Sequence, residues 1–212
     1  MDERAVRQWL AEELDVSRET FEKLDLFVSL LEVESRNQNL IAKSTMEIVW
    51  ERHLRDSAQL LMLADPALRS GRWIDLGSGP GLPGIVLALI GDMAMTLVEV
   101  RKRRVEFLQS AIERLQLGHR VRVEGRKLER VETRPMDVIT ARAFAALPQL
   151  FALAHRFSHA HTQWILPKGR RAQEELEAAR GTWQGDFSLE PSLTDSDAFI
   201  IVAHKVKPRR RS

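Results

Sequence analysis

A glycine-rich turn between two acidic residues is the part of this chain best suited to binding chemistry. The turn carries four glycines within eight residues, Gly77, Gly79, Gly81 and Gly84. It follows the short apolar run 73–76, which contains Asp75, and Glu99 ends the next apolar run. Because glycine has no Cβ and tolerates positive φ, such a turn lets a ligand approach the backbone closely. This order is typical of a nucleotide-like cofactor site at the C-terminal edge of a parallel sheet.

The glycine spacing by itself does not decide which cofactor binds. It matches the G-x-G-x-x-G fingerprint, and an acid about 20 residues further on, here Glu99, suits the ribose of NAD or of S-adenosylmethionine. Two features favour S-adenosylmethionine: the turn is longer than a pyrophosphate requires, and Asp75 suits an ammonium group better than a phosphate. A P-loop is excluded because no Gly-Lys-Ser/Thr follows. A NAD-binding oxidoreductase and a non-catalytic RNA-binding protein with a vestigial loop are the alternatives of other classes.

Composition places the chain among ordinary globular proteins. Its 212 residues, 44% hydrophobic and 29% charged, are enough for one large core. The absence of cysteine excludes disulfides and thiolate metal sites, and no metal site is expected. No apolar stretch reaches the ~20 residues that cross a bilayer, and the charged start lacks a signal-peptide core. We therefore expect a cytoplasmic monomer with no membrane contact.

Basic residues are clustered although the net charge is only +2. The clusters are Arg101–Arg104, Arg126 with Lys127 and Arg130, and Lys205–Arg211. Such clusters suit phosphate backbones, although a charge run is more commonly a solvated surface. We expect phosphate contacts at these three places.

Periodicity divides the chain into a helical start and an alternating remainder. Residues 1–70 predict a helical cap, residues 71–204 a domain of alternating strands and helices, and residues 205–212 a basic tail. The alternation predicts an α/β fold with a parallel sheet covered on both faces. Strands are expected at 73–77, 95–100, 120–125, 137–142, 162–167 and 197–206, the last as an edge strand at 199–204. Helices are expected near 83–91, 102–117, 147–157 and 170–180.

Further motifs accompany the glycine loop in a recognisable order. They are Asn39-Leu40, Arg52-His53-Leu54-Arg55-Asp56-Ser57, Glu99 with Lys102-Arg103 and Phe107-Leu108, Ala141-Arg142-Ala143-Phe144, and Lys168-Gly169. Together with residues 75–84, these segments resemble the bacterial small-subunit ribosomal RNA guanine-N7 methyltransferases, once called glucose-inhibited division protein B. The resemblance implies a Rossmann-like class I methyltransferase with a seven-stranded sheet. It implies methyl transfer from S-adenosylmethionine to N7 of a guanine in 16S rRNA, either as RNA or in the small ribosomal subunit or an assembly intermediate.

The resemblance also implies which residues bind the cofactor. The family positions fall on Gly77, Leu82, Glu99, Lys127, Leu128 and Arg142. The chemistry of the loop itself adds Asp75 and Gly79 to this site. The chain departs from the family at Lys127-Leu128, where small and acidic residues often follow the position of Arg126. Such a change is harmless if backbone groups hold the adenine.

Chemistry narrows the acceptor without fixing it. Guanine N7 carries a lone pair and no hydrogen, so its methylation needs positioning and a dry pocket more than a general base. The chain has no recognisable nucleophile–base constellation, no cysteine for pyrimidine-C5 attack and no Asn/Asp-Pro-Pro-Tyr/Phe motif for amino groups. Other RNA positions such as 2′-hydroxyls, small molecules and proteins survive this elimination.

Four further residues are candidates for the acceptor side. Arg142 ends the fourth expected strand and could take guanine O6 or a phosphate, while a salt-bridged arginine is the alternative. Phe144 could stack on the base or belong to the core. Lys168 ends the fifth expected strand and follows the same logic as Arg142. His53 lies three residues before Asp56, and such a spacing is more often a local helix pair than a catalytic dyad. With the resemblance, we expect His53 to position RNA or to brace the helical cap and not to transfer a proton.

Overall fold

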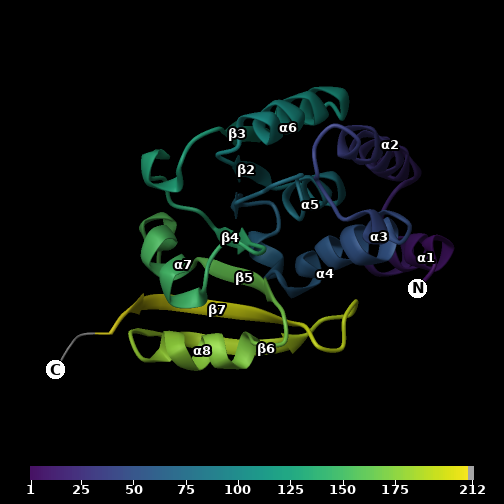
Figure 1. Ribbon diagram of the computed structural model, residues 1–212. Coiled ribbons are helices and arrows are strands. Elements are labelled where there is room, and N and C mark those ends of the chain that lie inside the picture. Colours follow the sequence, from purple (N-terminus) through teal and green to yellow (C-terminus); the bar gives the residue numbers. More distant parts are fainter. Residues whose placement is uncertain (210–212) are drawn as a thin grey trace.

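A twisted sheet runs through the centre of the computed structural model, which describes residues 1–209 (Figure 1). Within those residues seven strands lie in the order β3-β2-β1-β4-β5-β7-β6. The strands are β1 (Arg72–Leu76), β2 (Ala94–Val98), β3 (Val121–Glu124), β4 (Val138–Ala141), β5 (Gln163–Lys168), β6 (Trp183–Pro191) and β7 (Phe199–Pro208). β1 to β5 run parallel, and β7 is antiparallel to both of its neighbours. The predicted α/β class and mostly parallel sheet are confirmed.

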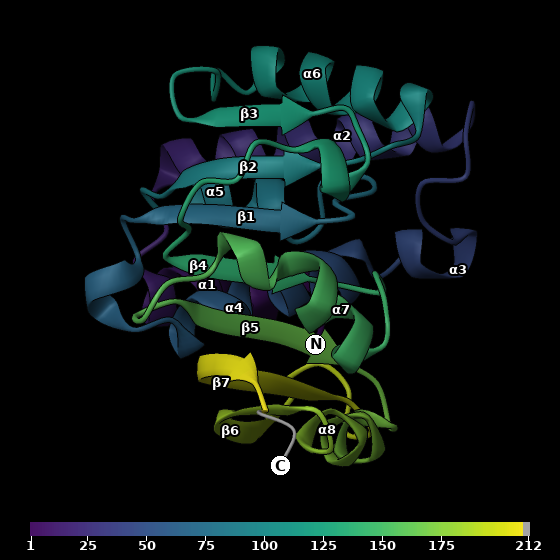
Figure 2. The same ribbon diagram turned by 90° about the vertical axis from the view of Figure 1, so that its left-hand side faces the viewer.

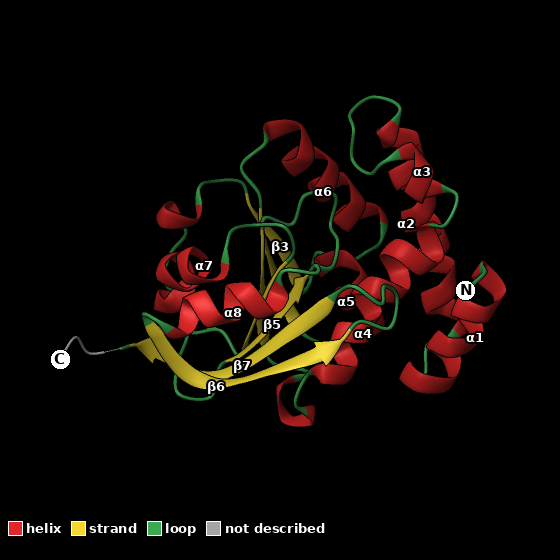
Figure 3. Ribbon diagram, turned by 60° about the horizontal axis from the view of Figure 1, so that its bottom comes forward, coloured by secondary structure: helices red, strands yellow, loops and turns green. Residues whose placement is uncertain are grey.

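Helices cover both faces of this sheet (Figure 3). The α-helices are α1 (Glu3–Leu14), α2 (Arg18–Ser35), α3 (Lys43–Met46), α4 (Asp56–Leu63), α5 (Gly84–Ile90), α6 (Lys102–Arg114), α7 (Leu147–Ala154) and α8 (Ala172–Arg180). A π-helical turn, η1 (Trp50–Arg55), leads directly into α4. Short 3₁₀ turns are η2 (Pro66–Leu68), η3 (Leu128–Arg130) and η4 (His155–Phe157). None of the helices within residues 1–209 combines the length and hydropathy that a bilayer crossing requires.

Successive residues of each strand enter two separate cores, because side chains alternate across a sheet. Trp73 and Leu97 join the core under α1, α2, α4, α5 and α6, whereas Ile74 joins the core under α7 and α8. Residues of the N-terminal helices, such as Leu24 and Leu54, are fully buried in the first core. The N-terminal segment therefore covers one sheet face rather than forming a core of its own.

The C-terminal strands differ from the sequence prediction. β6 is absent from the predicted strands, and it pairs with β7, so β7 is an inner strand and the prediction of an edge strand at 199–204 is wrong. β6 alternates half-buried Phe187 and Leu189 with polar residues, as an edge strand with one solvated face does.

The basic tail begins later in the chain than the sequence prediction of residue 205. β7 continues to Pro208, where it pairs with Trp183, so residues 205–208 belong to the sheet. Lys205 forms an ion pair with Asp186 of the neighbouring strand at 2.9 Å. The tail prediction beyond Arg209 falls on Arg210, Arg211 and Ser212, which lie outside the described residues.

The sheet topology creates a crevice at the C-terminal ends of β1 and β4. β2 lies on one side of β1 and β4 on the other, so the chain leaves β1 toward α5 on one face and leaves β4 toward α7 on the opposite face. Ligands of open α/β sheets bind at such a switch point. The arrows of β1 to β3 point toward this edge in Figure 2, and α3 lies beyond them.

Candidate active site

The glycine turn after β1 folds back against the end of β2. Its Gly77, Gly79 and Gly81 adopt positive φ angles of 69°, 56° and 92°, a region in which other residues are strained. Ser78 fastens the turn, because its amide donates to the Val98 carbonyl at 3.0 Å. The three glycines therefore add no side chains of their own to the turn, and Phe144 and Ile85 pack where side chains at Gly77 and Gly81 would lie.

Glu99, directly after β2, binds this turn through its carboxylate. Oε2 accepts from the amide of Gly79 at 3.0 Å, and Oε1 accepts from the amides of Val100 and Arg101 at 2.7 and 2.9 Å. Arg104 Nη1 lies 3.9 Å from Oε2. The structure thus brings Gly79 and Glu99 together, as the sequence predicts. A carboxylate oxygen has more than one acceptor site, so Oε2 can also accept a hydroxyl.

Asp75 lies beneath the turn and is fully buried. Its Oδ1 accepts from Thr140 Oγ1 at 3.1 Å, while Oδ2 has no hydrogen-bond partner. A Cβ at Gly84 would approach Oδ2 to 2.9 Å, so the carboxylate points toward the start of α5. Burial raises the pKa of Asp75 to about 6. The side chain is therefore enclosed below the loop, whereas the sequence analysis expects it to face a ligand directly.

The other cofactor positions offer mainly backbone. The Leu82 side chain is buried in the core, and its amide donates to the Ser78 carbonyl. The Leu128 side chain is buried in the opposite core together with Val98, while Lys127 is exposed on the loop after β3. The roles of Leu82, Lys127 and Leu128 stay predictions, and at the two leucines only main-chain atoms are left for a cofactor.

A cleft of about 610 Å³ opens beside the glycine turn. Three of the candidates for the acceptor side line it, namely His53, Arg142 and Lys168. Phe144 lines it as well, and a Cβ at Gly77 would lie only 2.7 Å from Phe144 Cδ2. The ring therefore packs on the glycine turn where a side chain would have no room, and the cleft and the turn meet there.

Arg142 follows β4 at the rim of the cleft, and about a quarter of its side chain is exposed (26%). Nη1 donates to Asp56 Oδ2 at 3.2 Å, the only hydrogen bond of this guanidinium within residues 1–209. The next residue, Ala143, has a φ of 53°, a conformation rare outside glycine and found at strained functional sites. The arginine is salt-bridged and still has donors available for a ligand.

Lys168, at the end of β5, is engaged within the protein. Nζ donates to the Ala145 carbonyl at 2.9 Å and to Glu175 Oε2 at 2.8 Å, and the side chain is 10% exposed. These contacts tie the segment after β4 to α8. Lys168 lines the cleft as a bound, neutralised cation, and its role toward the acceptor stays a prediction.

His53 belongs to the π-helical turn η1 and contacts α3 instead of Asp56. Nε2 lies 2.9 Å from Thr45 Oγ1, and Nδ1 is buried without a partner. Burial, followed by the nearby Arg142 charge, lowers the pKa of His53 to about 4. No hydrogen bond joins His53 and Asp56 within the described residues, although the Asp56 charge acts on the imidazole and partly offsets the lowering of its pKa. The role of His53 stays a prediction.

Sequence reasoning misses one part of the cleft entirely. The loop between β6 and β7 brings Asp195 and Ala198 to the cleft wall, and its Thr194 bonds to Asp56. Ser192, Thr194 and Asp195 form a polar cluster in the sequence, but nothing in that cluster says which helix it contacts.

The residues around the turn fit an S-adenosylmethionine site. Asp75 is enclosed beneath the turn, so its carboxylate would act on the ammonium group of a bound ligand through a bridging water or through its charge, not by direct contact. Glu99 already accepts from three amides and keeps lone-pair capacity for a ribose hydroxyl beside Gly79. The positive-φ glycines put no side chain of their own between the backbone and a ligand.

Comparison with known proteins agrees with this geometry. Residues 20–194 match the family model GidB, rRNA small subunit methyltransferase G. The chain belongs to this family. It is 51% identical over 213 residues to ribosomal RNA small subunit methyltransferase G of Rhizorhabdus wittichii, with 99% of this chain and 95% of that protein covered. The enzyme of the same name from Zymomonas mobilis is 48% identical over 209 residues, with 96% and 94% covered. The family predicted from the GidB motifs is confirmed.

Solved structures support the fold alone. An O-methyltransferase of Bacillus cereus in complex with SAH superposes with a TM-score of 0.61 at 17% identity, over 95% of this chain and 97% of that one. A TehB-like SAM-dependent methyltransferase of Corynebacterium glutamicum gives 0.58 at 16% identity, over 84% and 98%. The Rossmann-like class I methyltransferase fold is therefore confirmed for this member of the GidB family.

Proposed function

We propose that this GidB-family chain transfers a methyl group from S-adenosylmethionine to N7 of a guanine in 16S rRNA of the small ribosomal subunit. The observation that carries the proposal is the contact between Phe144 and Gly77, because it makes the cleft and the cofactor turn neighbours. A base held in the cleft would then lie next to a cofactor held by the turn and Glu99. Family membership supports both the cofactor and the RNA substrate.

The cleft suits an acceptor that needs no proton removed. When bound, S-adenosylmethionine supplies an electrophilic methyl on a sulfonium. Guanine N7 attacks through its own lone pair, so the protein has to orient the base and exclude water. His53, with its pKa near 4, is a weak base at neutral pH, and Lys168 is ion-paired with Glu175. The carboxylates of Asp56 and Asp195, which also line the cleft, are ion-paired with Arg142 and Arg52. This absence of a free base at the described cleft residues favours N7 over a 2′-hydroxyl, whose methylation calls for a general base.

Two residues are assigned to the acceptor. Arg142 keeps guanidinium donors free at the rim of the cleft, which supports its assignment to guanine O6 or a phosphate. Phe144 presents a half-buried ring in the same cleft, where an unstacked base would stack on it. Exposed cations at Arg101, Lys102 and Arg103 lie after Glu99 and suit RNA phosphates.

We further propose that the enzyme acts as a cytoplasmic monomer. Within residues 1–209 the exposed large apolar side chains are few and lie on separate segments, for example Val33, Met62 and Leu193. Such scattered residues are normal for a monomer. Light scattering of the purified protein would return the mass of one chain, and a twofold mass would contradict this part.

The test is methyl transfer to defined acceptors. Protein is incubated with methyl-labelled S-adenosylmethionine and, in parallel, undermethylated 16S rRNA, undermethylated small subunits, protein and small-molecule extracts. Label in the RNA of at least one RNA sample supports the proposal, and label confined to protein or small molecules contradicts it. Calorimetry with S-adenosylhomocysteine and with NAD separates the oxidoreductase alternative, because only the former should bind.

A further inference from the structure

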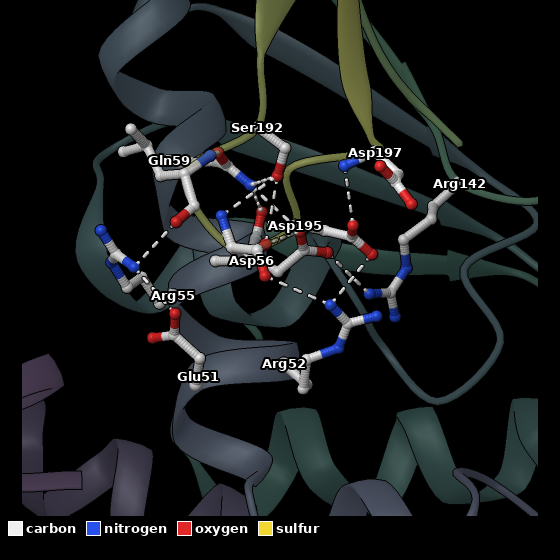
Figure 4. A network of polar contacts seen from close by, with 11 residues as sticks. Glu51, Arg52, Arg55, Asp56, Gln59, Arg142, Ser192, Asp195 and Asp197 are labelled. Carbon is white, nitrogen blue, oxygen red and sulfur yellow. Dashed lines mark hydrogen bonds and ion pairs between the residues drawn. The ribbon is translucent and has the colours of Figure 1, made fainter. Parts of the chain in front are cut away.

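Asp56 is the meeting point of three segments that lie far apart in the sequence (Figure 4). Oδ1 accepts from Gln59 Nε2 at 3.0 Å and from Thr194 Oγ1 at 2.7 Å, and Oδ2 accepts from Arg142 Nη1 at 3.2 Å. These donors come from α4, from the loop between β6 and β7, and from the residue after β4. The carboxylate is 22% exposed, so the ion pair lies partly shielded from water.

Its hydrogen bonds fix the direction of this carboxylate. Gln59 and Thr194 hold Oδ1 from two sides, and Oδ2 is then left pointing at Arg142. Gln59 is itself anchored, because its Oε1 accepts from the amide of Leu193 at 2.8 Å. Because the acceptor oxygen is already fixed, its charge-assisted hydrogen bond sets the orientation of the Arg142 guanidinium and also stabilises that orientation.

Arg142 needs an external anchor of this kind. It stands after the last residue of β4 and before Ala143, whose φ is 53°, so the regular strand no longer constrains it. Its long side chain has several rotatable bonds, and within the described residues Asp56 is its only hydrogen-bond partner. Without Asp56 the guanidinium would be free to sample other rotamers over the cleft.

We propose that Asp56 is a positioning residue that holds Arg142 in the orientation required at the target base, with Thr194 setting the carboxylate. The inference rests on the proposed function, because it assigns Arg142 to the acceptor. Its physical basis is that misplacing a substrate-orienting group lowers the rate of the chemical step more than it weakens binding.

A double-mutant cycle tests this assignment. The single-turnover methyl-transfer rate at saturating small subunits is measured for wild type, Asp56→Asn, Arg142→Ala and the double variant. Asp56→Asn should lower the rate about tenfold or more while leaving KM for the subunit within about twofold; tenfold corresponds to about 1.4 kcal/mol. In the Arg142→Ala background the same substitution should have no further effect, because Arg142 transmits it. Thr194→Val should give a smaller loss in the same direction.

Arg55→Gln is the matched control for loosening the same junction. Arg55, the last residue of η1, donates from Nη1 to the Leu193 carbonyl at 3.0 Å and so also connects this helix to the loop between β6 and β7. It contacts neither Arg142 nor the cleft. Arg55→Gln should lower the melting temperature without the rate loss. A rate loss equal to that of Asp56→Asn, or an undiminished effect of Asp56→Asn in the Arg142→Ala background, would overturn the positioning role. Absence of any RNA methylation by wild type would instead overturn the proposed function.

Discussion

Replacement of Asp75 by asparagine should make the cofactor-free protein more stable while weakening cofactor binding. The carboxyl is fully buried, with one oxygen unpartnered, and burial raises its pKa from 3.8 to about 6. Between these two pH values the folded chain holds the proton more tightly than the unfolded chain. Stability contributed by this group therefore falls as pH rises from about 4 to about 6 and stays low above that.

The magnitude follows from the same shift. A difference of about two pH units corresponds to about 3 kcal/mol of unfavourable burial of the charged form at neutral pH. Asparagine has nearly the same shape and no charge, so Asp75→Asn should stabilise the protein by up to about 3 kcal/mol above pH 7. The gain should vanish toward pH 4, where the aspartate is itself protonated.

Urea denaturation of both proteins between pH 4 and 8, without cofactor, measures this difference, since all other titrating groups are shared. Glu106→Gln, which removes an exposed carboxylate on α6, is the control and should give no such pH dependence. Calorimetry with S-adenosylhomocysteine should show weaker binding to Asp75→Asn. A variant that is less stable than wild type at pH 8, or a difference independent of pH, would refute the reasoning.

Other substitutions test the remaining parts of the site. Glu99→Gln places an amide NH₂ against the backbone amide of Gly79 or of Val100 and removes a ribose acceptor. The Kd for S-adenosylhomocysteine, measured by calorimetry, should therefore rise about tenfold or more. An unchanged Kd would remove Glu99 from the cofactor site. Gly77→Ala should lose about 1–2 kcal/mol in denaturant unfolding from its left-handed backbone alone, and more from the clash with Phe144; a neutral result would mean that the turn rearranges freely. Since the pKa of His53 is near 4 and that of Asp75 is near 6, the single-turnover rate should be flat from about pH 7 to 9, and a tenfold rise per pH unit would indicate a hydroxyl or amino acceptor. Lys102→Gln with Arg103→Gln should reduce the slope of log affinity for RNA against log salt by about 0.7 per lost contact and spare the rate at saturating RNA, whereas an unchanged slope would make these residues solvated surface only.

The cofactor half of the site could be predicted from the sequence because it is built from neighbours in the chain. The glycine turn, Asp75 before it and Glu99 after the next strand all follow from local order, and parallel pairing of β1 with β2 then brings Glu99 to Gly79. The enclosure of Asp75 could not be predicted, because it depends on how α5 sits against the turn.

The acceptor half depends on contacts between distant segments. Asp56 bonds to Thr194 and Arg142, and no periodicity in the sequence links these positions. The sequence does not indicate β6 for a related reason: Phe187 and Leu189 alternate as in a strand, but Gly185 near its start and Pro191 at its end are typical of turns. Its pairing with β7 then places the loop between them against the N-terminal helices.

Mapping the methylated nucleoside in small-subunit RNA tests the central claim most directly. Undermethylated small subunits and the RNA extracted from them are each incubated with the protein and methyl-labelled S-adenosylmethionine, digested to nucleosides and analysed by mass spectrometry. We predict that the label appears as N7-methylguanosine at one position of 16S rRNA and that Arg142→Ala reduces its yield. Label on a ribose 2′-oxygen, on an exocyclic amine or on another base would contradict the account.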